Sequence, residues 1–299
     1  MYDVIVLTQE EYINPKKVDW YIQNILDEDN YVLEALRSQG LKAEKRDWAD
    51  ITFDWSSTKS VIFRTTWDYF DRYPEFAPWL AEVSTKCLLL NSADIINWNI
   101  DKHYLSDLMD AGLNVAPSIF IKKGSDISLS QLFENAGWSE AVLKPTISGA
   151  ARHTYRLTPA NAAEHEEIFA KLINEEDMIF QEFLSDIVEY GEISLMFIGG
   201  EYTHAVRKIA KSGDFRVQDD HGGTVEIHEA TTGEIEFGKA SLEACPYNPV
   251  YARIDIVRDN KGKLSLCELE LIEPELWFRN NPDSATKLAE ACKEIIDTL

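Results

Sequence analysis

The stretch YARIDIVRDNKGKLSLCELELIEPE, residues 251–275, decides the fold because it predicts two β-strands joined by a turn at residues 259–262. Side chains alternate along a strand, so Arg253 and Asp255 share one face with Glu268 and Glu270. A loop centred on residues 260–261 predicts that Asp255 and Glu268 are diagonal neighbours, about 7–8 Å apart at the backbone. A three-residue loop would shift the register and separate these acids.

The polar face of this hairpin offers ligands for a hard cation. Asp255, Glu268 and Glu270 would point the same way, and Mg²⁺ prefers carboxylate oxygens. We therefore predict a magnesium site here. A solvated strand face with a cross-strand pair between Arg253 and Glu268 is an equally valid interpretation of the hairpin alone.

Composition describes a globular and strongly acidic protein. The 299 residues suffice for two or three domains, and 45% of them are hydrophobic. The 52 acidic residues outnumber the 29 basic ones, giving a net charge of −23 without a basic patch. A phosphate backbone would be repelled, so we expect no nucleic-acid partner, whereas the charge says little about a ligand the size of a nucleotide. The start MYDVIVLTQEEY has no basic leader and no apolar run approaches membrane length, so we expect a cytoplasmic protein without a membrane partner.

Residues 1–92 predict a small α/β domain with a largely parallel sheet. Apolar strand patterns occur at residues 2–8, 41–46, 60–64 and 87–91, with helical patterns at 31–40 and 74–85. Arg64 ends one of these strands, where open α/β sheets place ligands, and is a candidate carboxylate anchor. Pairing of Arg64 with Asp68 or Asp71 is the alternative.

The middle of the chain carries two lysines and a loop of small residues. We predict one amphipathic helix over 95–111, with Lys102 near its middle, and a strand over 140–144 that ends at Lys144. The following segment TISGAAR, residues 146–152, can curl its backbone N–H groups around a phosphate, although it would also suit an ordinary turn. Further strands are predicted at 178–184 and, around Gly199-Gly200, at 192–199 and 202–208.

These segments, in this order, resemble the ATP-grasp superfamily, whose members clamp ATP between two α+β subdomains behind an N-terminal α/β domain. The resemblance is most specific at Asp255 with Glu268-Leu269-Glu270, at the spacing of Lys102 and Lys144, and at MIFQEFL followed by GEISLMF. It implies an ATP-grasp fold of mixed α/β and α+β class. The implied domains are an N-terminal α/β (pre-ATP-grasp) substrate-side domain at 1–92, a central subdomain at 93–180 and a C-terminal subdomain with the metal site at 181–299.

The resemblance also implies cofactors, ATP and Mg²⁺, and a role for each of a set of residues. Many relatives have Asn two residues after the metal-binding Glu, where this chain has Glu270, so a third carboxylate alters the charge of the site. Lys102 and Lys144 would bind the ATP phosphates, and the loop Ser148-Gly149-Ala150-Ala151 would cover them. Gln181, Glu182 and Leu184 would contact the adenine, and Glu192, with Glu189 in reserve, would bind the ribose hydroxyls. Asp255, Glu268 and Glu270 would hold Mg²⁺.

Two further motifs resemble the glutathione-synthetase-like branch of the superfamily. HAVRK and GDFRVQDDHGG would supply Arg207 and Arg216 for the transferred phosphate and the acyl substrate, acting with Lys144, while Arg64 and Arg253 are candidate substrate contacts. FRTTWDY, VLKPTISGAARHT and ELELIEPEL are similar to the cyclo-ligase family of cycloserine biosynthesis, which closes O-ureido-D-serine.

The resemblance implies a small-molecule substrate that is amino-acid-like. The implied reaction is its ATP-dependent carboxylate–amine ligation through an acyl phosphate, with ADP as product and an intramolecular cyclisation as one form of it. A small-molecule kinase and a nucleotide-binding protein without catalysis are the alternatives, although the retained metal acids argue against the second. The N-terminal domain lacks the GxGxxG of a dinucleotide oxidoreductase. A homodimer is a further expectation from the superfamily, without a surface that the sequence identifies.

Overall fold

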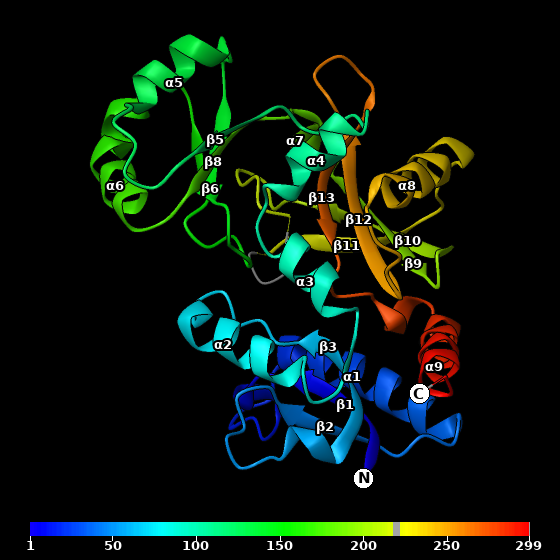
Figure 1. The fold of residues 1–299 in the computed structure, drawn as a ribbon. Coiled ribbons are helices and arrows are strands. Elements are labelled where there is room, and N and C mark those ends of the chain that lie inside the picture. The colour runs from blue at the N-terminus through cyan, green and yellow to red at the C-terminus, as the bar shows by residue number, and fades with distance from the viewer. Residues whose placement is uncertain (218–221, 299) are drawn as a thin grey trace.

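The computed structural model describes residues 1–217 and 222–298, and the named strands of this part of the chain form three separate sheets (Figure 1). The first sheet is wholly parallel in the order β2-β1-β3-β4. Its strands are β1 (Tyr2–Thr8), β2 (Ala43–Asp47), β3 (Thr58–Thr65) and β4 (Leu88–Leu90). The α/β fold expected for this region is confirmed, because neighbouring parallel strands must be joined by crossover connections, which helices usually form.

The first helix of this region begins earlier than the apolar pattern predicts. Helix α1 (Trp20–Ser38) begins at Trp20 instead of residue 31, because Asp19 accepts hydrogen bonds from the N–H groups of Tyr21 and Ile22. Helix α2 (Tyr73–Val83) follows β3. Two short 3₁₀ helices, η1 (Glu10–Tyr12) and η2 (Trp55–Ser57), lie after β1 and before β3.

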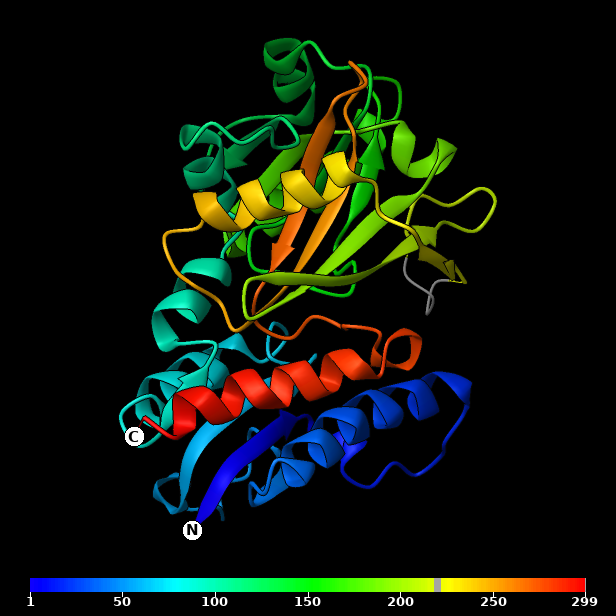
Figure 2. The same ribbon diagram turned by 90° about the vertical axis from the view of Figure 1, so that its right-hand side faces the viewer.

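The last helix of the chain returns to the N-terminal sheet. Helix α9 (Asp283–Ile296) lies beside α1 in Figure 2, and the 3₁₀ helix η4 (Phe278–Asn280) precedes it. Leu288 and Cys292 of α9 are fully buried in one core with Val32 and Leu36 of α1. The two ends of the sequence therefore share a hydrophobic core.

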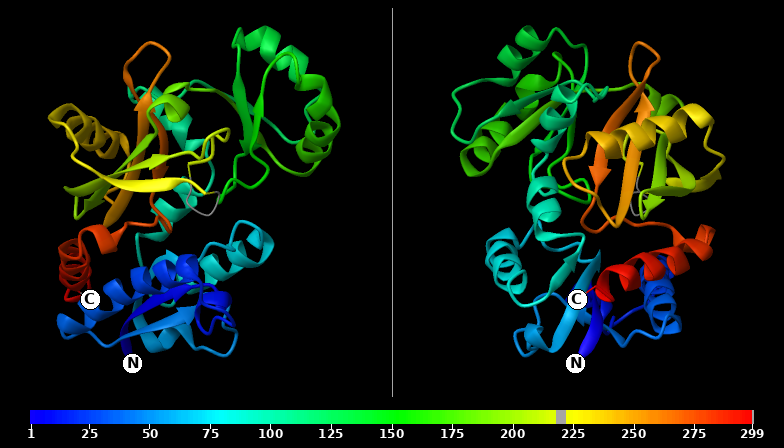
Figure 3. Two further views of the ribbon diagram at one scale, coloured as in Figure 1. Left: turned by 180° about the vertical axis from the view of Figure 1, so that it is seen from behind. Right: turned by 45° about the vertical axis from the view of Figure 1, so that its right-hand side comes forward.

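The second sheet is antiparallel in the order β5-β8-β6-β7. Helices α5 (Leu129–Ala136) and α6 (Ala162–Glu175) cover its outer face (Figure 3). Leu143 and Phe180 of the sheet pack there against Phe133 and Phe169 of the helices. Its strands are β5 (Ser118–Ile121), β6 (Ala141–Pro145), β7 (Tyr155–Leu157) and β8 (Met178–Glu182). The expected boundary at 180/181 falls inside β8, and the domain limits stay predictions.

The third sheet is antiparallel in the order β11-β10-β9-β12-β13. Its apolar face packs against α8 (Thr232–Ala244) and against α3 (Ala93–Asn99) and α4 (Tyr104–Asp110). The short helix α7 (Asp186–Glu189) leads into it. The strands are β9 (Glu192–Ile198), β10 (Glu201–Ile209), β11 (Thr224–His228), β12 (Tyr251–Arg258) and β13 (Leu264–Glu270). Among the described helices, none has both the length and the hydropathy to cross a bilayer.

The single helix predicted over 95–111 is wrong, because α3 ends at Asn99 and α4 begins at Tyr104. In the break, the backbone N–H of Lys102 donates to the carbonyl of Thr146 at 3.0 Å. Lys102 is 6% exposed, and its Nζ donates to the carbonyl of Ser148 at 2.7 Å. The break thus turns this lysine inward, toward the loop at 146–152.

Candidate active site

The hairpin of β12 and β13 has a three-residue loop rather than the two-residue loop of the favoured sequence interpretation. Asp259 pairs with Lys263, whose carbonyl accepts from the Asp259 N–H at 2.7 Å. Gly262 adopts a φ of +79°, which glycine tolerates at no steric cost. Taken alone, this loop would set Asp255 opposite Cys267 and send Glu268 to the other face.

A β-bulge restores the polar face. The register shifts between Asp255 and Ile256, so that Ile256 pairs with Leu266 whereas Asp255 pairs with Glu268, leaving Cys267 as the extra residue. Asp255 and Glu268 are therefore directly opposite, which corrects the diagonal arrangement expected from the sequence. Arg253 pairs with Glu270 in the same register.

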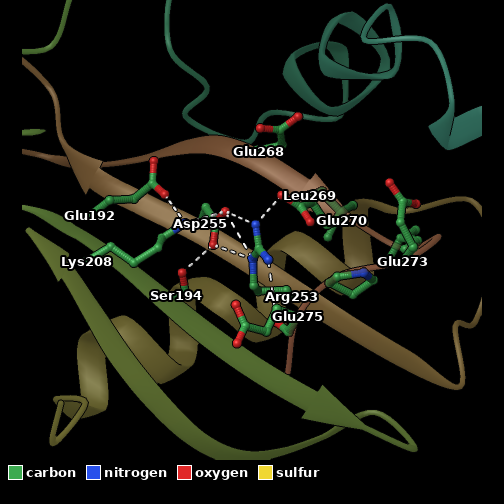
Figure 4. A network of polar contacts seen from close by, with 12 residues as sticks. Glu192, Ser194, Lys208, Arg253, Asp255, Glu268, Leu269, Glu270, Glu273 and Glu275 are labelled. Carbon is green, nitrogen blue, oxygen red and sulfur yellow. Dashed lines mark hydrogen bonds and ion pairs between the residues drawn. The ribbon is translucent and has the colours of Figure 1, made fainter. Parts of the chain in front are cut away.

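Asp255 is held by three neighbours and is 2% exposed (Figure 4). Its oxygens accept from the Ser194 hydroxyl at 2.6 Å, from Lys208 Nζ at 3.1 Å and from Arg253 Nη2 at 2.9 Å. Burial raises the pKa of Asp255, but the positive charges of Arg253 and Lys208 outweigh burial and lower the pKa to about 2. Asp255 is therefore ionised at neutral pH.

A second bulge places Lys208, and not Arg207, at this site. A plain two-residue hairpin about Gly199-Gly200 would pair Glu192 with Arg207, but the register shifts between Tyr202 and His204 and pairs Glu192 with Lys208. Lys208 is 4% exposed and forms ion pairs with Glu192 and Asp255. These two acids raise the pKa of Lys208 against the opposing effect of burial.

The two acids of β13 differ in protonation. Glu268 pairs with Lys102 at 2.9 Å, and although burial raises its pKa, Lys102 and Lys144 lower it to about 2. Glu270 pairs with Arg253, yet burial, together with the charges of Asp255 and Glu268, raises the pKa of Glu270 to about 7. The third carboxylate is thus the one nearest to neutrality.

A cavity of about 280 Å³ lies over this face and is bounded by all three regions of the chain. It brings together most of the site residues expected from the sequence. Those that line it are Lys102, Lys144, Ser148, Gly149, Ala150, Gln181, Glu182, Leu184, Glu192, Arg216, Arg253, Asp255, Glu268 and Glu270.

The loop at 146–152 approaches the N-terminal domain closely. A Cβ atom on Gly149 would lie 2.5 Å from Cε1 of Phe70, so only glycine fits without a shift of that ring. Ala150 and Ala151 have φ values of +47° and +56°, a region that non-glycine residues adopt rarely and at some cost. This backbone strain lies in the segment predicted to cover a phosphate.

Three predicted site residues do not line the cavity. Arg207 stacks over Tyr190 and pairs with Glu226 at 2.9 Å on the other face of the sheet. Glu189 is exposed at the end of α7, whereas Glu192, the first choice for the same role, lines the cavity. The catalytic placement of Arg207 and the reserve role of Glu189 are thus corrected.

Arg64 is also corrected, because it is 0% exposed and cannot meet a substrate carboxylate. Its Nη2 donates to the carbonyl of Pro274 at 2.5 Å and lies 3.6 Å from Glu28. Neither Asp68 nor Asp71, the alternative partners, is involved; Asp68 pairs with Arg72. Arg64 ties β3 to the segment that follows β13.

Sequence reasoning missed Lys208, Ser194, Tyr69 and Glu273, which lie in or beside the cavity. Alternation along β9 would have found Ser194, because it stands two residues from Glu192. No local pattern marks Tyr69 or Glu273, whose places depend on how the N-terminal domain meets the end of β13.

The residues fit a hard cation by chemistry, although they do not form a cage for one. No three carboxylate, imidazole or thiol groups in the described residues are gathered closely enough to hold a metal ion. Asp255, Glu268 and Glu270 are each paired with a lysine or arginine instead. Their oxygens are the ligands that Mg²⁺ prefers. A bound cation would compete with these positive side chains for the same oxygens.

Comparison with known proteins gives two family matches along the chain. Residues 4–91 match the family described as "D-cycloserine synthetase DcsG, N-terminal domain". Residues 114–259 match the family described as "Prokaryotic glutathione synthetase, ATP-grasp domain". The N-terminal match covers the parallel sheet, and the second match covers most of the two antiparallel sheets.

Individual relatives agree with these families. The chain is 30% identical over 278 residues to the cycloserine biosynthesis protein DcsG of Streptomyces lavendulae, covering 88% of this chain and 92% of the relative. The crystal structure of D-cycloserine synthetase DcsG superposes with a TM-score of 0.85 at 28% identity, covering 98% and 99% of the two chains. The ATP-grasp ligase PsnB, in a complex with Mg and ADP, has a TM-score of 0.66 at 17% identity over 99% and 100%, and shares the fold.

Proposed function

We propose a nucleotide site, a metal site and a substrate class from the premise that this chain belongs to the ATP-grasp superfamily, in the family of the cycloserine biosynthesis protein DcsG. The chain is an ATP-dependent carboxylate–amine ligase. The substrate carboxylate takes the γ-phosphoryl group of ATP and ADP leaves. An amine-type nitrogen then forms a C–N bond as the C–O bond to phosphate breaks and the nitrogen loses a proton. Positioning and charge stabilisation are the protein's main contributions to such a reaction.

One observation carries the proposed site. Asp255, Glu268 and Glu270 lie on one face of a sheet, inside a cavity, with Lys102, Lys208 and Arg253 within ion-pair distance. Three acids in so little space are costly unless a positive group compensates them. Mg-ATP brings both the cation for the acids and the phosphates for the lysines.

We assign the nucleotide to the side of the cavity formed by the two ATP-grasp sheets. Lys102 and Lys144 would neutralise the phosphates beneath the loop at 146–152, whose backbone already curls in the left-handed region. Gln181, Glu182 and Leu184 end β8 and would meet the adenine edge. Glu192, the acid that lines the cavity, would take the ribose hydroxyls.

We assign the metal to Glu268 and Glu270, with Asp255 completing the set of acids. Mg²⁺ there would supply positive charge to the transferring phosphate. Lys208 takes the role expected for Arg207, and Arg216, which lines the cavity, keeps its proposed role at the transferred phosphate or acyl group. Arg253 lies between Asp255 and Glu270 and is the candidate contact for the substrate carboxylate.

The proposed substrate is a small amino acid that carries its own nucleophile, as in the closure of O-ureido-D-serine. The test is ADP formation from Mg-ATP with O-ureido-D-serine and a panel of other amino acids, followed by mass spectrometry of the product. We expect a product lighter than the amino acid by one water, and turnover that is lost in Glu268→Ala. ADP formation that yields a stable phosphorylated product would refute ligation in favour of a kinase, and an absence of Mg-ATP binding would refute the site.

A further inference from the structure

Two of the acids that line the cavity have no ion-pair partner among the described residues, and one of them lies close to the acidic face of the hairpin. Five of the acids that line the cavity form ion pairs, namely Glu192, Asp255, Glu268, Glu270 and Glu275. Glu182 and Glu273 form no ion pair with any residue that the structure describes. Glu182 belongs to the nucleotide side, where its oxygen accepts from the Asn260 amide at 3.0 Å. Glu273 lies beyond Glu270 in Figure 4, on the side away from Glu192 and Lys208.

The backbone around Glu273 is anchored to the N-terminal domain. The indole Nε1 of Trp67 donates to the carbonyl of Glu273 itself at 2.9 Å. Arg64 donates to the next carbonyl, that of Pro274, at 2.5 Å. Glu28 accepts from the N–H of Leu276 at 2.7 Å. These buried contacts explain Arg64 as a positioning residue, and they give the Glu273 side chain a definite place in the cavity.

The surroundings of Glu273 are largely aromatic, and no cation among the described residues forms an ion pair with it. Lys102 and Arg253 act on its carboxyl group only at longer range. Its carboxyl group is hydrogen bonded to the hydroxyl of Tyr69, which is 5% exposed. The described cavity residues contributed by the N-terminal domain are Tyr21, Trp67, Tyr69 and Phe70, and none of these is a cation. Trp277 also lines the cavity, where its ring lies beside Arg253, and its buried indole N–H has no acceptor among the described residues. Aromatic faces and a carboxylate together suit a cationic amine.

The electrostatics around Glu273 agree with this chemistry. Burial raises the pKa of Glu273 to about 8, and the charge of Glu270 adds to the rise. A positive ligand group would reverse both effects by favouring the ionised carboxylate.

We propose that Glu273 recognises the positively charged amine of the substrate, so that the ligase selects amino acids over carboxylic acids without an amine. The substrate carboxylate then points toward Arg253 and the transferred phosphate, and the ammonium group points toward Glu273 and its aromatic walls. This inference rests on the proposed ligase function, because it assumes that the substrate and the nucleotide share the cavity.

The test compares two compounds that differ only in the amine. O-ureido-D-serine and 3-(ureidooxy)propanoate, which has hydrogen in place of the amine, are titrated calorimetrically into protein loaded with Mg²⁺ and a non-hydrolysable ATP analogue. We expect the amine to improve the Kd of the native protein by about 30-fold, as a charge-assisted hydrogen bond does. Glu273→Gln should reduce this preference to a few-fold, Glu273→Asp should retain most of it, and Glu34→Gln, an exposed change on α1, should leave it unaltered.

The outcomes separate this inference from the function on which it rests. If the protein binds the nucleotide and turns over the amino acid, yet Glu273→Gln keeps the full preference for the amine, the inference is overturned and the ligase function stands. If the native protein binds both compounds equally tightly, Glu273 does not recognise the amine and the inference is overturned. A failure to bind Mg-nucleotide in the first step would instead overturn the proposed function, together with the inference built on it.

Discussion

The replacement Lys208→Met tests the site most directly, because it removes one positive charge from between two buried acids. Lys208 is 4% exposed and pairs with both Glu192 and Asp255. Methionine keeps the length of the side chain but leaves the acids short of a cation. Breaking a buried ion pair in this way costs about 3–5 kcal/mol. Because Arg253 still compensates Asp255, we expect the lower end, about 3 kcal/mol of unfolding free energy at neutral pH.

The pH dependence of this loss has a definite sign. Without Lys208, the folded-state pKa values of Glu192 and Asp255 rise, so the folded variant binds more protons than the native fold does. The deficit should therefore be largest near pH 7 and should shrink as the pH falls toward 5. Urea unfolding, followed by tryptophan fluorescence at several pH values, measures it.

Arg207→Met is the matched control for Lys208→Met. The two residues are adjacent on β10, but Arg207 points to the other face, where it pairs with the exposed Glu226. We expect Lys208→Met to lower kcat/KM in ADP formation by about 100-fold or more, the scale for losing one electrostatic contact to the transition state. Arg207→Met should change kcat/KM less than threefold and stability by less than about 0.5 kcal/mol. A larger loss in Arg207→Met than in Lys208→Met would refute the register on which the site is built.

Three further changes probe the structure around the cavity. Gly149→Ala places a Cβ 2.5 Å from the Phe70 ring, so we expect KM for ATP to rise about tenfold or more. Adding Phe70→Leu to this variant should lower KM part of the way back. Unchanged ATP kinetics in Gly149→Ala alone would contradict the close approach. Arg64→Met leaves Glu28 buried without this cation, so the unfolding free energy measured in urea titrations should fall by about 3 kcal/mol. A variant as stable as the native chain would show that the ion pair is dispensable. Burial lowers the pKa of His204, so this residue contributes stability that is lost as the pH falls below about 6.5, the pKa of an unfolded histidine. The native chain should therefore lose stability relative to His204→Gln between pH 7 and 5, and a constant difference between the two proteins would count against it.

Much of the fold and of the active-site inventory could be predicted from residue patterns. Alternation in YARIDIV and CELEL assigns the hairpin and its acidic face, and the order of strands and helices leads to the ATP-grasp fold. Lys102, Lys144, Glu192 and the loop at 146–152 were all expected in the site and line the cavity. These features are local, because each depends on residue types within one strand, one helix or one loop.

Register, by contrast, is decided only when strands pair. One bulge sets Asp255 opposite Glu268 despite a three-residue loop, and another brings Lys208 to the site in place of Arg207. A bulge adds one unpaired residue, and no particular residue type marks either of these two bulges. The alternation of side chains along a single strand therefore does not reveal them.

Long-range packing decided the remaining differences. Arg64 ends a strand, where a ligand contact was expected, but it is completely buried. It lies against Glu28 of the first helix and donates to the carbonyl of Pro274, which follows the last strand. Glu273 owes its place in the cavity to Trp67 and Tyr69 from the other domain. The sequence by itself determined which chemical groups this protein has and on which elements they lie. The tertiary structure decided which groups face one another, because burial and ion pairing depend on neighbours that lie far apart in the chain.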